Sequence, residues 1–233
     1  MATLVAFSGG KDSTAMAYRM AELGSEFSLL FTPTGNELPG VAEHVQATAK
    51  VLGKPLIVPP GPTLATLIET FGALPNNRQR WCTRMIKIEP CRAYLLANPG
   101  STLCVGLRAD EEERQGMYGG QASYRFPLRE WGWGIGDVLG YLNEKGIAVP
   151  PRTDCALCYD QRLGDWKNLL RQYPEEYAKG EALEDATGHT FRSPTRDTWP
   201  AGLRAMRLEF ERGRKVRGED DDCEKTACRV CRL

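Results

Sequence analysis

The chain has 233 residues, of which 42% are hydrophobic and 26% are charged, and 30 basic residues balance 30 acidic ones. This composition is typical of a folded protein and excludes a disordered chain, and the zero net charge provides no overall field to attract nucleic acid or an anionic membrane. No apolar run approaches the roughly 20 residues that cross a bilayer, and the N-terminus has no export leader. We therefore expect a cytoplasmic protein without membrane contact.

The first part of the chain alternates short apolar runs with segments of helical periodicity. Thr3–Phe7 is an apolar, β-branched run before a Gly-Gly turn, and Ser13–Leu23 carries apolar residues at helical spacing. The pattern continues with a strand at Glu26–Phe31, a helix at Pro39–Leu52 that Gly53 stops, and a strand at Leu56–Val58. Such alternation predicts parallel strands joined by crossover helices.

The remaining elements are fewer and more widely spaced. We predict a helix at Arg84–Leu96, a buried strand at Leu103–Leu107, a helix at Gly136–Lys145 and a weak helix at Pro200–Arg212. The loops after parallel strands lie at the carboxyl edge of the sheet, where ligands bind in open α/β folds. A ligand site is therefore expected at the loops that follow the first and last of the predicted strands.

A Gly-Gly turn separates the first predicted strand from the first predicted helix. Backbone amides and the positive helix end converge there, which favours an anion. The glycines allow close approach of phosphate oxygens, the lysine adds positive charge, the serines can donate hydrogen bonds, and the aspartate fits a helix cap. The candidate phosphate-binding residues are Ser8, Gly9, Gly10, Lys11, Asp12 and Ser13. A simple turn followed by a capped helix is the alternative.

This loop resembles the PP-loop signature of the ATP pyrophosphatase and sulfonucleotide reductase superfamily, and its spacing differs from that of the Walker loop. The resemblance implies an α/β protein with a Rossmann-like, adenine nucleotide alpha hydrolase-like sheet, mostly parallel and flanked by helices. It also implies a nucleotide-binding domain over residues 1–160, which includes the candidate cluster cysteines. Residues 161–233 would form a helical C-terminal extension with an irregular, cysteine-rich tail.

Further segments extend the resemblance over most of residues 4–160. Phe31–Pro39 is similar to the segment that holds the adenosine, which assigns Thr34 and Gly35 to the nucleotide site, although Pro33 stands where an aspartate is usual. The G-L-R-x-D segment and a later arginine are similar to the part that contacts anionic groups of the nucleotide. This likeness assigns Arg108 and Arg114 to the same site, and a guanidinium suits phosphate or sulfate oxygens.

Eight cysteines in a chain without an export signal point to metal binding or catalysis. Cys155 and Cys158 have the C-x-x-C spacing that lets two thiolates reach one metal or cluster. Trp81–Pro90 resembles the family's cluster-binding segment, with Trp81 in place of a first cysteine and Pro90 about one residue late. The resemblance implies a 4Fe–4S cluster held by Cys82, Cys155 and Cys158, with its fourth iron open or ligated from elsewhere.

Other interpretations of the cysteines remain open. Zinc uses the same spacing as a cluster, and buried cysteine without a ligand is a common alternative. We expect this last state for Cys91 and Cys104, which fall in a helical and a strand pattern. The only histidines, His44 and His189, leave little basis for a histidine triad, and His44 is expected to be a surface or packing residue.

The C-terminal tail resembles the K-T-E-C-G-x-H tail that carries the nucleophilic cysteine of sulfonucleotide reductases. It matches at Lys225, Thr226 and Cys228, but Ala227 and Arg229 depart from the pattern. The resemblance assigns catalytic roles to Cys228, as the nucleophile, and to Lys11. Cys228 and Cys231 also form a C-x-x-C pair, which suits a redox couple or a second metal half-site. The role of Cys223 stays open.

The leading hypothesis is a phosphoadenosine phosphosulfate (PAPS) reductase-like oxidoreductase. It would bind PAPS or adenylyl sulfate (APS), attack the sulfate sulfur with Cys228, and release sulfite with a thiol reductant such as thioredoxin. The rival is an ATP-dependent sulfurtransferase similar to those of DNA phosphorothioation and tRNA thiolation, which would require Mg²⁺ and a nucleic acid or small-molecule acceptor. A non-catalytic nucleic-acid-binding module, with Arg192 to Arg217 as its contact face, is a third hypothesis. The sequence is also compatible with a homo-oligomer.

Overall fold

A parallel sheet forms the centre of the molecule. The computed structural model describes residues 2–76, 78–111, 123–150 and 152–216. Within these ranges five strands form one sheet in the order β3-β2-β1-β4-β5, and every neighbouring pair is parallel. The strands are β1 (Thr3–Ala6), β2 (Ser28–Leu30), β3 (Leu56–Ile57), β4 (Thr102–Cys104) and β5 (Ser123–Arg125). The predicted parallel α/β fold is confirmed.

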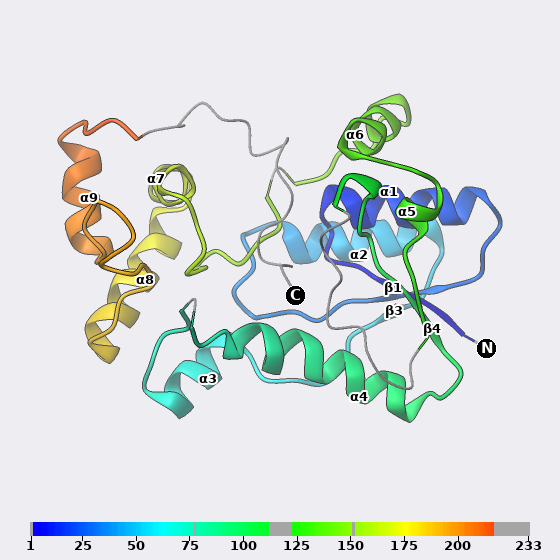
Figure 1. Cartoon of the computed structure of the whole chain (residues 1–233), viewed down its shortest axis with the longest axis horizontal. Coiled ribbons are helices and arrows are strands. Elements are labelled where there is room, and N and C mark those ends of the chain that lie inside the picture. The colour runs from blue at the N-terminus through cyan, green and yellow to red at the C-terminus, as the bar shows by residue number, and fades with distance from the viewer. Residues whose placement is uncertain (1, 77, 112–122, 151, 217–233) are drawn as a thin grey trace.

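Helices cover both faces of this sheet. Figure 1 shows α1, α2 and α6 on one face and α4 on the other, with α7, α8 and α9 gathered at one end of the molecule. The helices are α1 (Lys11–Glu22), α2 (Val41–Leu52), α3 (Leu64–Phe71), α4 (Glu89–Ala97), α5 (Pro127–Glu130), α6 (Ile135–Glu144), α7 (Leu163–Gln172), α8 (Pro174–Thr187) and α9 (Leu203–Glu211). Among the described helices, none combines the length and apolar character that a membrane span requires.

The central strand β1 is buried because both faces of the sheet are covered. Val5 lies opposite Leu29 of β2 and Cys104 of β4, and all three are fully buried. Helix α1 packs Ala15 and Met16 against one face, and Leu4 on the other face joins a smaller cluster near α4. Parallel strands buried on both sides read as continuous apolar runs, which is why the sequence identified them.

Most predicted boundaries shift by one to three residues in the structure, and a few differences are informative. The predicted helix at Arg84–Leu96 is a π-helical segment at Thr83–Ile88 (η1) followed by α4. The π-helical turns lead directly into α4, and Pro90 lies in the first turn of α4, where proline is tolerated. The strand predicted at Leu103–Leu107 ends at Cys104, and the helix predicted from Ser13 already begins at Lys11. Strand β5 was not predicted, because two of its three residues are exposed and polar.

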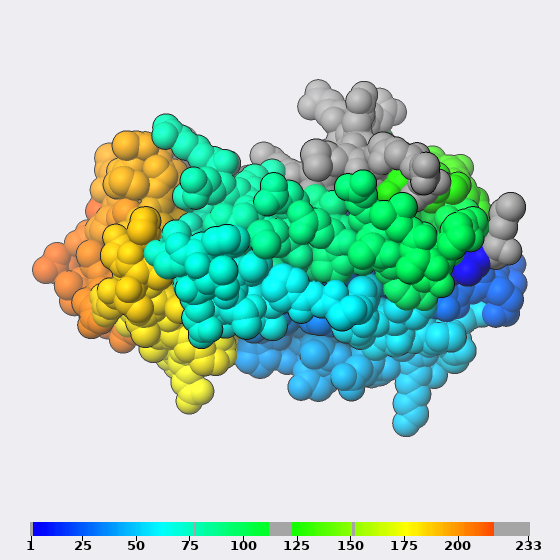
Figure 2. Space-filling model, turned by 90° about the horizontal axis from the view of Figure 1, so that it is seen from below, coloured from blue at the N-terminus to red at the C-terminus, as the bar shows by residue number. Residues whose placement is uncertain are grey.

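The C-terminal helices share a core with α3 and η1. Trp166 of α7, Tyr177 of α8 and Met206 of α9 are fully buried in one cluster, which also contains Leu67 and Ile86. Figure 2 shows these helices forming one end of the molecule, beside the face that α4 and the segment leading into α3 cover. The domain boundary at residue 160 stays a prediction, since apolar packing crosses it.

Helix α8 buries polar as well as apolar side chains, so its periodicity is weak in the sequence. Glu184 is buried, and its two carboxylate oxygens accept hydrogen bonds from separate segments. Oε1 accepts from the backbone N–H of Phe191 at 2.9 Å, and Oε2 accepts from the N–H of Leu203 at 2.6 Å. This side chain therefore anchors the loop after α8 and the first residue of α9.

We predict that Glu184→Gln lowers the free energy of unfolding by about 1–3 kcal/mol, because the amide group of glutamine faces one of the two N–H donors and leaves it unpaired. Urea denaturation measures the change. Glu211→Gln is the matched control, since Glu211 is exposed at the end of α9. Equal stability of the two variants would contradict the anchoring role of Glu184.

Candidate functional site

The phosphate loop, defined as Ser8–Ser13, joins β1 to α1 as predicted. Gly9 has a φ of +76°, a left-handed conformation that side chains rarely adopt. The Ser13 hydroxyl donates to the carbonyl of Gly10 at 3.1 Å, and the N–H of Ser8 donates to Ser13 Oγ at 3.3 Å. Because Gly10 is the N-cap and has no side chain to cap α1, the positive end of this helix faces the loop. The loop is therefore preorganised for an anion.

Asp12 does not cap α1 as the sequence suggested. Its Oδ2 accepts a hydrogen bond at 2.9 Å from Nη1 of Arg108, which lies in the loop after β4. Burial raises the pKa of Asp12, while the positive charges of Arg108 and Lys11 oppose that rise. The ion pair across 96 residues of sequence explains why a local capping rule failed here: a guanidinium is a stronger partner for the carboxylate than a backbone N–H.

The segment after β2 lies beside the C-x-x-C pair. Thr34 is only 3% exposed, and both its N–H and its hydroxyl donate to Oε1 of Glu37, at 2.6 and 2.7 Å. Gly35 lies against the side chain of Thr63 at the start of α3. The nucleotide-binding roles of Thr34 and Gly35 stay predictions, and the structure places the Thr34 side chain toward the cysteines.

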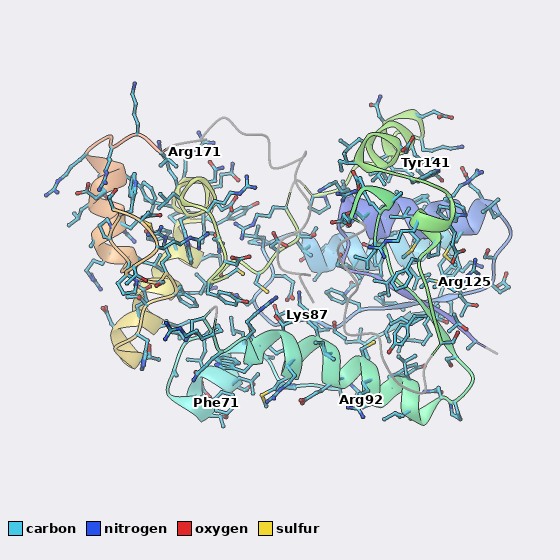
Figure 3. The ribbon with its side chains drawn as sticks, in the orientation of Figure 1. Phe71, Lys87, Arg92, Arg125, Tyr141 and Arg171 are labelled. Atoms are coloured by element: carbon cyan, nitrogen blue, oxygen red, sulfur yellow. The ribbon has the colours of Figure 1, made fainter. Side chains whose placement is uncertain are left out.

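Cys82, Cys155 and Cys158 come together at one pocket, which we call the cysteine pocket. They arise from the residue before η1 and from the loop between α6 and α7. Figure 3 shows Lys87 pointing from η1 toward the middle of the molecule, where it lines the same pocket. The lining is completed by Thr34, Leu64, Pro75, Thr83, Ile86, Leu157 and Tyr159. The sequence thus identified three thiols that the fold brings to one place.

The surroundings of Cys82 and Cys158 favour the protonated thiol. Burial is the main cause of the raised pKa of Cys82, and the neighbouring Cys155 adds to it. Burial also raises the pKa of Cys158 strongly, again with a contribution from Cys155. The Cys155 thiol donates to the Thr34 hydroxyl at 3.5 Å. Without a bound cation, Cys82 and Cys158 are poor nucleophiles, since the thiolate is the reactive form.

The donor set fits a cluster or a zinc ion in chemistry, because three sulfur atoms line a single pocket. Their present arrangement is looser than a metal site. No group of three or more His, Cys, Asp or Glu side chains in the described part of the chain is spaced to hold a metal ion. Binding would therefore require the three sulfur atoms to move closer together.

The phosphate loop and the cysteine pocket are neighbours. A Cβ atom on Gly10 would lie 2.8 Å from Oγ1 of Thr153, two residues before Cys155. On the other side, Thr34 contacts Cys155, and the N–H of Ala156 donates to the carbonyl of Asn36 at 2.7 Å. Residues of the C-x-x-C segment thus touch both candidate nucleotide-binding segments.

Two other cysteines and one histidine are buried or partly buried outside the cysteine pocket. Cys91 and Cys104 lie away from the pocket, and burial raises the pKa of each thiol to about 11, in agreement with an inert role. His44 packs against the phosphate loop, with its Cδ2 3.2 Å from the position of a Cβ on Gly9. Burial lowers the pKa of His44, and a hydrogen bond with the Gly9 backbone partly opposes this shift. Arg114, Cys223, Cys228 and Cys231 lie outside the described residues.

Sequence reasoning missed two contributors to the site, Thr153 and Glu111. Glu111 is buried beside Arg108, and Thr153 contacts the phosphate loop. A glutamate in a charged stretch and a threonine before a C-x-x-C pair give no local signal. Only their position in the fold reveals them.

The arginine-rich segment expected as a nucleic-acid face is occupied by internal contacts where it is described. Arg192 is buried and donates to Asp197 at 2.6 Å. Arg207 pairs with Glu181 at 2.6 Å, and Arg214 pairs with Glu209 at 3.1 Å. These ion pairs stabilise the C-terminal helices, so they favour a structural role for this segment.

Comparisons with known proteins give a consistent assignment. The family model described as the phosphoadenosine phosphosulfate reductase domain matches residues 2–168. Two uncharacterized proteins of Methanocaldococcus jannaschii are similar: MJ0066 is 25% identical over 211 residues and MJ0973 is 26% identical over 190 residues. The alignments cover 76% and 74% of this chain. The chain spans only 43% and 45% of the length of these relatives.

The fold also has solved counterparts. PAPS reductase from Candida auris, in its phosphate complex, superposes with a TM-score of 0.52 and 14% identity over 64% of this chain and 75% of the other. The U34-tRNA thiolase NcsA from Methanococcus maripaludis, with its [4Fe-4S] cluster, covers 87% of this chain and 76% of its own, at 13% identity. Its TM-score of 0.43 is too low to support an argument about function. Because the family model matches well over half of its length, the chain belongs to the phosphoadenosine phosphosulfate reductase domain family.

Proposed function

We propose that this chain is an enzyme that binds an adenine nucleotide at the phosphate loop and carries out sulfur chemistry beside it. The observation that carries the proposal is the contact between the two half-sites, in which Thr153 touches Gly10 and Thr34 touches Cys155. A sulfur atom attached to, or activated by, a nucleotide at the loop would lie next to three thiols. Membership of the PAPS reductase family supports the same class of reaction.

The first candidate reaction is reduction of PAPS or adenylyl sulfate. Cys228 attacks the sulfate sulfur as a thiolate, the bond from sulfur to the phosphate oxygen breaks, and the nucleotide leaves with that electron pair. A second thiol, from a reductant such as thioredoxin, then attacks the Cys228 sulfur, releasing sulfite and leaving a disulfide. The amides of the phosphate loop and Lys11 would hold the anionic nucleotide during both steps.

The second candidate is ATP-dependent sulfur transfer to a nucleic acid or small molecule. The position of the cysteine pocket favours it, because a donor sulfur must lie beside the activated adenylate. Cys82, Cys155 and Cys158 would hold a 4Fe–4S cluster or, alternatively, zinc. When bound, a cluster would supply a Lewis-acidic iron able to ligate sulfur. Mg²⁺ would offset the charge of the leaving pyrophosphate.

We predict that Lys11→Ala combined with Ser13→Ala weakens binding of ATP and of adenylyl sulfate at least about tenfold, because the loop loses a cation and the hydroxyl that orders it. Isothermal titration calorimetry measures the affinity. Lys50→Ala is the control, since Lys50 is exposed on α2. Unchanged affinity in the double variant would rule out the phosphate loop as the nucleotide site.

We predict that anaerobically prepared protein contains iron and sulfide, and that Cys82→Ser, Cys155→Ser or Cys158→Ser each removes them. Loss of one of three thiolates leaves too few ligands for the cluster. Metal analysis and the visible absorption spectrum provide the measurement, with Cys91→Ser as the control outside the pocket. If metal analysis finds zinc and no iron, the cysteines hold a structural zinc ion and not a cluster. If it finds neither metal, the proposed metal-binding role is contradicted.

The two candidate reactions differ in the fate of Cys228. A reductase incubated with PAPS or adenylyl sulfate should gain the mass of one SO₃ group, and Cys228→Ser should not, because the S-sulfo intermediate forms on that sulfur. Intact-mass spectrometry detects the adduct. If no adduct forms and ATP instead releases pyrophosphate when an acceptor is added, sulfur transfer is the reaction.

A further inference from the structure

Arg108 is a buried cation enclosed by carboxylates at the edge of the phosphate loop. The residue is only 3% exposed. Its Nη1 lies 2.9 Å from Asp12 Oδ2, its Nε lies 2.8 Å from Asp110 Oδ1, and its Nη2 lies 3.7 Å from Glu111 Oε1. Each nitrogen of the guanidinium therefore faces an acidic partner within the protein.

The backbone around Arg108 is fixed by further contacts. Arg129 donates from Nε to the carbonyl of Arg108 at 3.2 Å and from Nη2 to the carbonyl of Glu111 at 2.6 Å. Asp110 Oδ2 accepts from the N–H of Ile135 at 2.9 Å, at the start of α6. The backbone of Gly106 packs against the first turn of α1, since a Cβ there would lie 3.3 Å from the N of Ser13. The described part of the loop after β4, residues 105–111, is thus held against α1 from several sides.

A direct contact between this guanidinium and a bound phosphate or sulfate would require it to leave these partners. Asp12 would then remain as a buried carboxylate beside an anionic ligand, without its hydrogen-bonded cation and with only the smaller effect of Lys11 to offset its charge. Removing one partner of a buried ion pair is strongly unfavourable. The arrangement is therefore better suited to holding Asp12 than to binding the nucleotide.

We propose that Arg108 is a positioning residue, which fixes the phosphate loop and neutralises Asp12 rather than contacting the nucleotide itself. The inference rests on the proposed nucleotide site and changes the role expected of Arg108. By pairing with Asp12 in the first turn of α1, Arg108 keeps the loop amides aimed at the ligand and removes a repulsive charge from its side.

A double-mutant cycle tests this role. Calorimetry measures the affinities for ATP and for adenylyl sulfate in the wild type, Arg108→Met, Asp12→Asn and the double variant. We expect Arg108→Met to weaken binding about tenfold or more in the wild-type background but less than about threefold in the Asp12→Asn background. The reason is that the penalty comes from the unpaired Asp12 charge. Equal losses in both backgrounds, or no loss in either, would overturn the proposal.

The pH dependence of binding gives a second readout, which a purely structural role would not change. In Arg108→Met, Asp12 keeps Lys11 as its cation and Glu111 as a repelling neighbour, so its already raised pKa should rise further. Protonation then removes the repulsion, and affinity should increase as the pH falls. This dependence should disappear in the double variant, and its persistence there would contradict a role through Asp12.

Two further variants serve as controls. Arg108→Lys keeps the charge but loses the forked geometry, so it should lie between the wild type and Arg108→Met and provides a test if the methionine variant is unstable. Arg92→Met removes an exposed arginine of α4, labelled in Figure 3, and should leave affinity unchanged.

The outcomes also separate this inference from the proposed nucleotide site. If the affinity losses of Arg108→Met and Asp12→Asn add up in the double variant, while Lys11→Ala with Ser13→Ala still weakens binding, only the inference about Arg108 is overturned. Full binding by that Lys11 and Ser13 variant would overturn the proposed site itself.

Discussion

A buried ion pair between Arg108 and Asp12 joins the two loops on which the candidate nucleotide site depends. Strands β1 and β4 are hydrogen-bonded neighbours in a parallel sheet, so the loops that follow them emerge at the same edge. Without the guanidinium, the buried carboxylate in the first turn of α1 would lose its hydrogen-bonded cation and would lie beside an anion site with only Lys11 to offset its charge. The net charge beside the phosphate loop therefore depends on Arg108, which is far from the loop in the sequence.

The same edge of the sheet brings the cysteines to the nucleotide. The segment after β2 contributes Thr34, whose hydroxyl accepts from Cys155 and donates to Glu37. The C-x-x-C loop also reaches the phosphate loop through Thr153. Neither half-site can move far without affecting the other. Under the proposed function, these contacts would hold the nucleotide and the cysteines beside each other in one site.

The C-terminal helices pack against residues that line the cysteine pocket. Leu157 of the C-x-x-C segment lies in the same apolar cluster as Trp166 and Tyr177, and Ile86 of η1 joins it. The π-helical turns of η1 lead directly into α4, which holds Pro90 in its first turn. The pocket is thus built on a packed core, although the residues that line it come from three separate parts of the chain.

The sequence by itself determined the fold class, the phosphate loop and the Cys155–Cys158 pair, whereas Cys82 was assigned through the family resemblance. These features are local: apolar runs, a Gly-Gly turn between strand and helix, and a C-x-x-C spacing all act over a few residues. Tertiary structure decided the rest. The partner of Asp12, the orientation of Thr34 toward Cys155 and the contact of Thr153 with Gly10 all join residues distant in sequence. No local pattern specifies such pairs, because only the packing of the sheet and its loops brings them into contact.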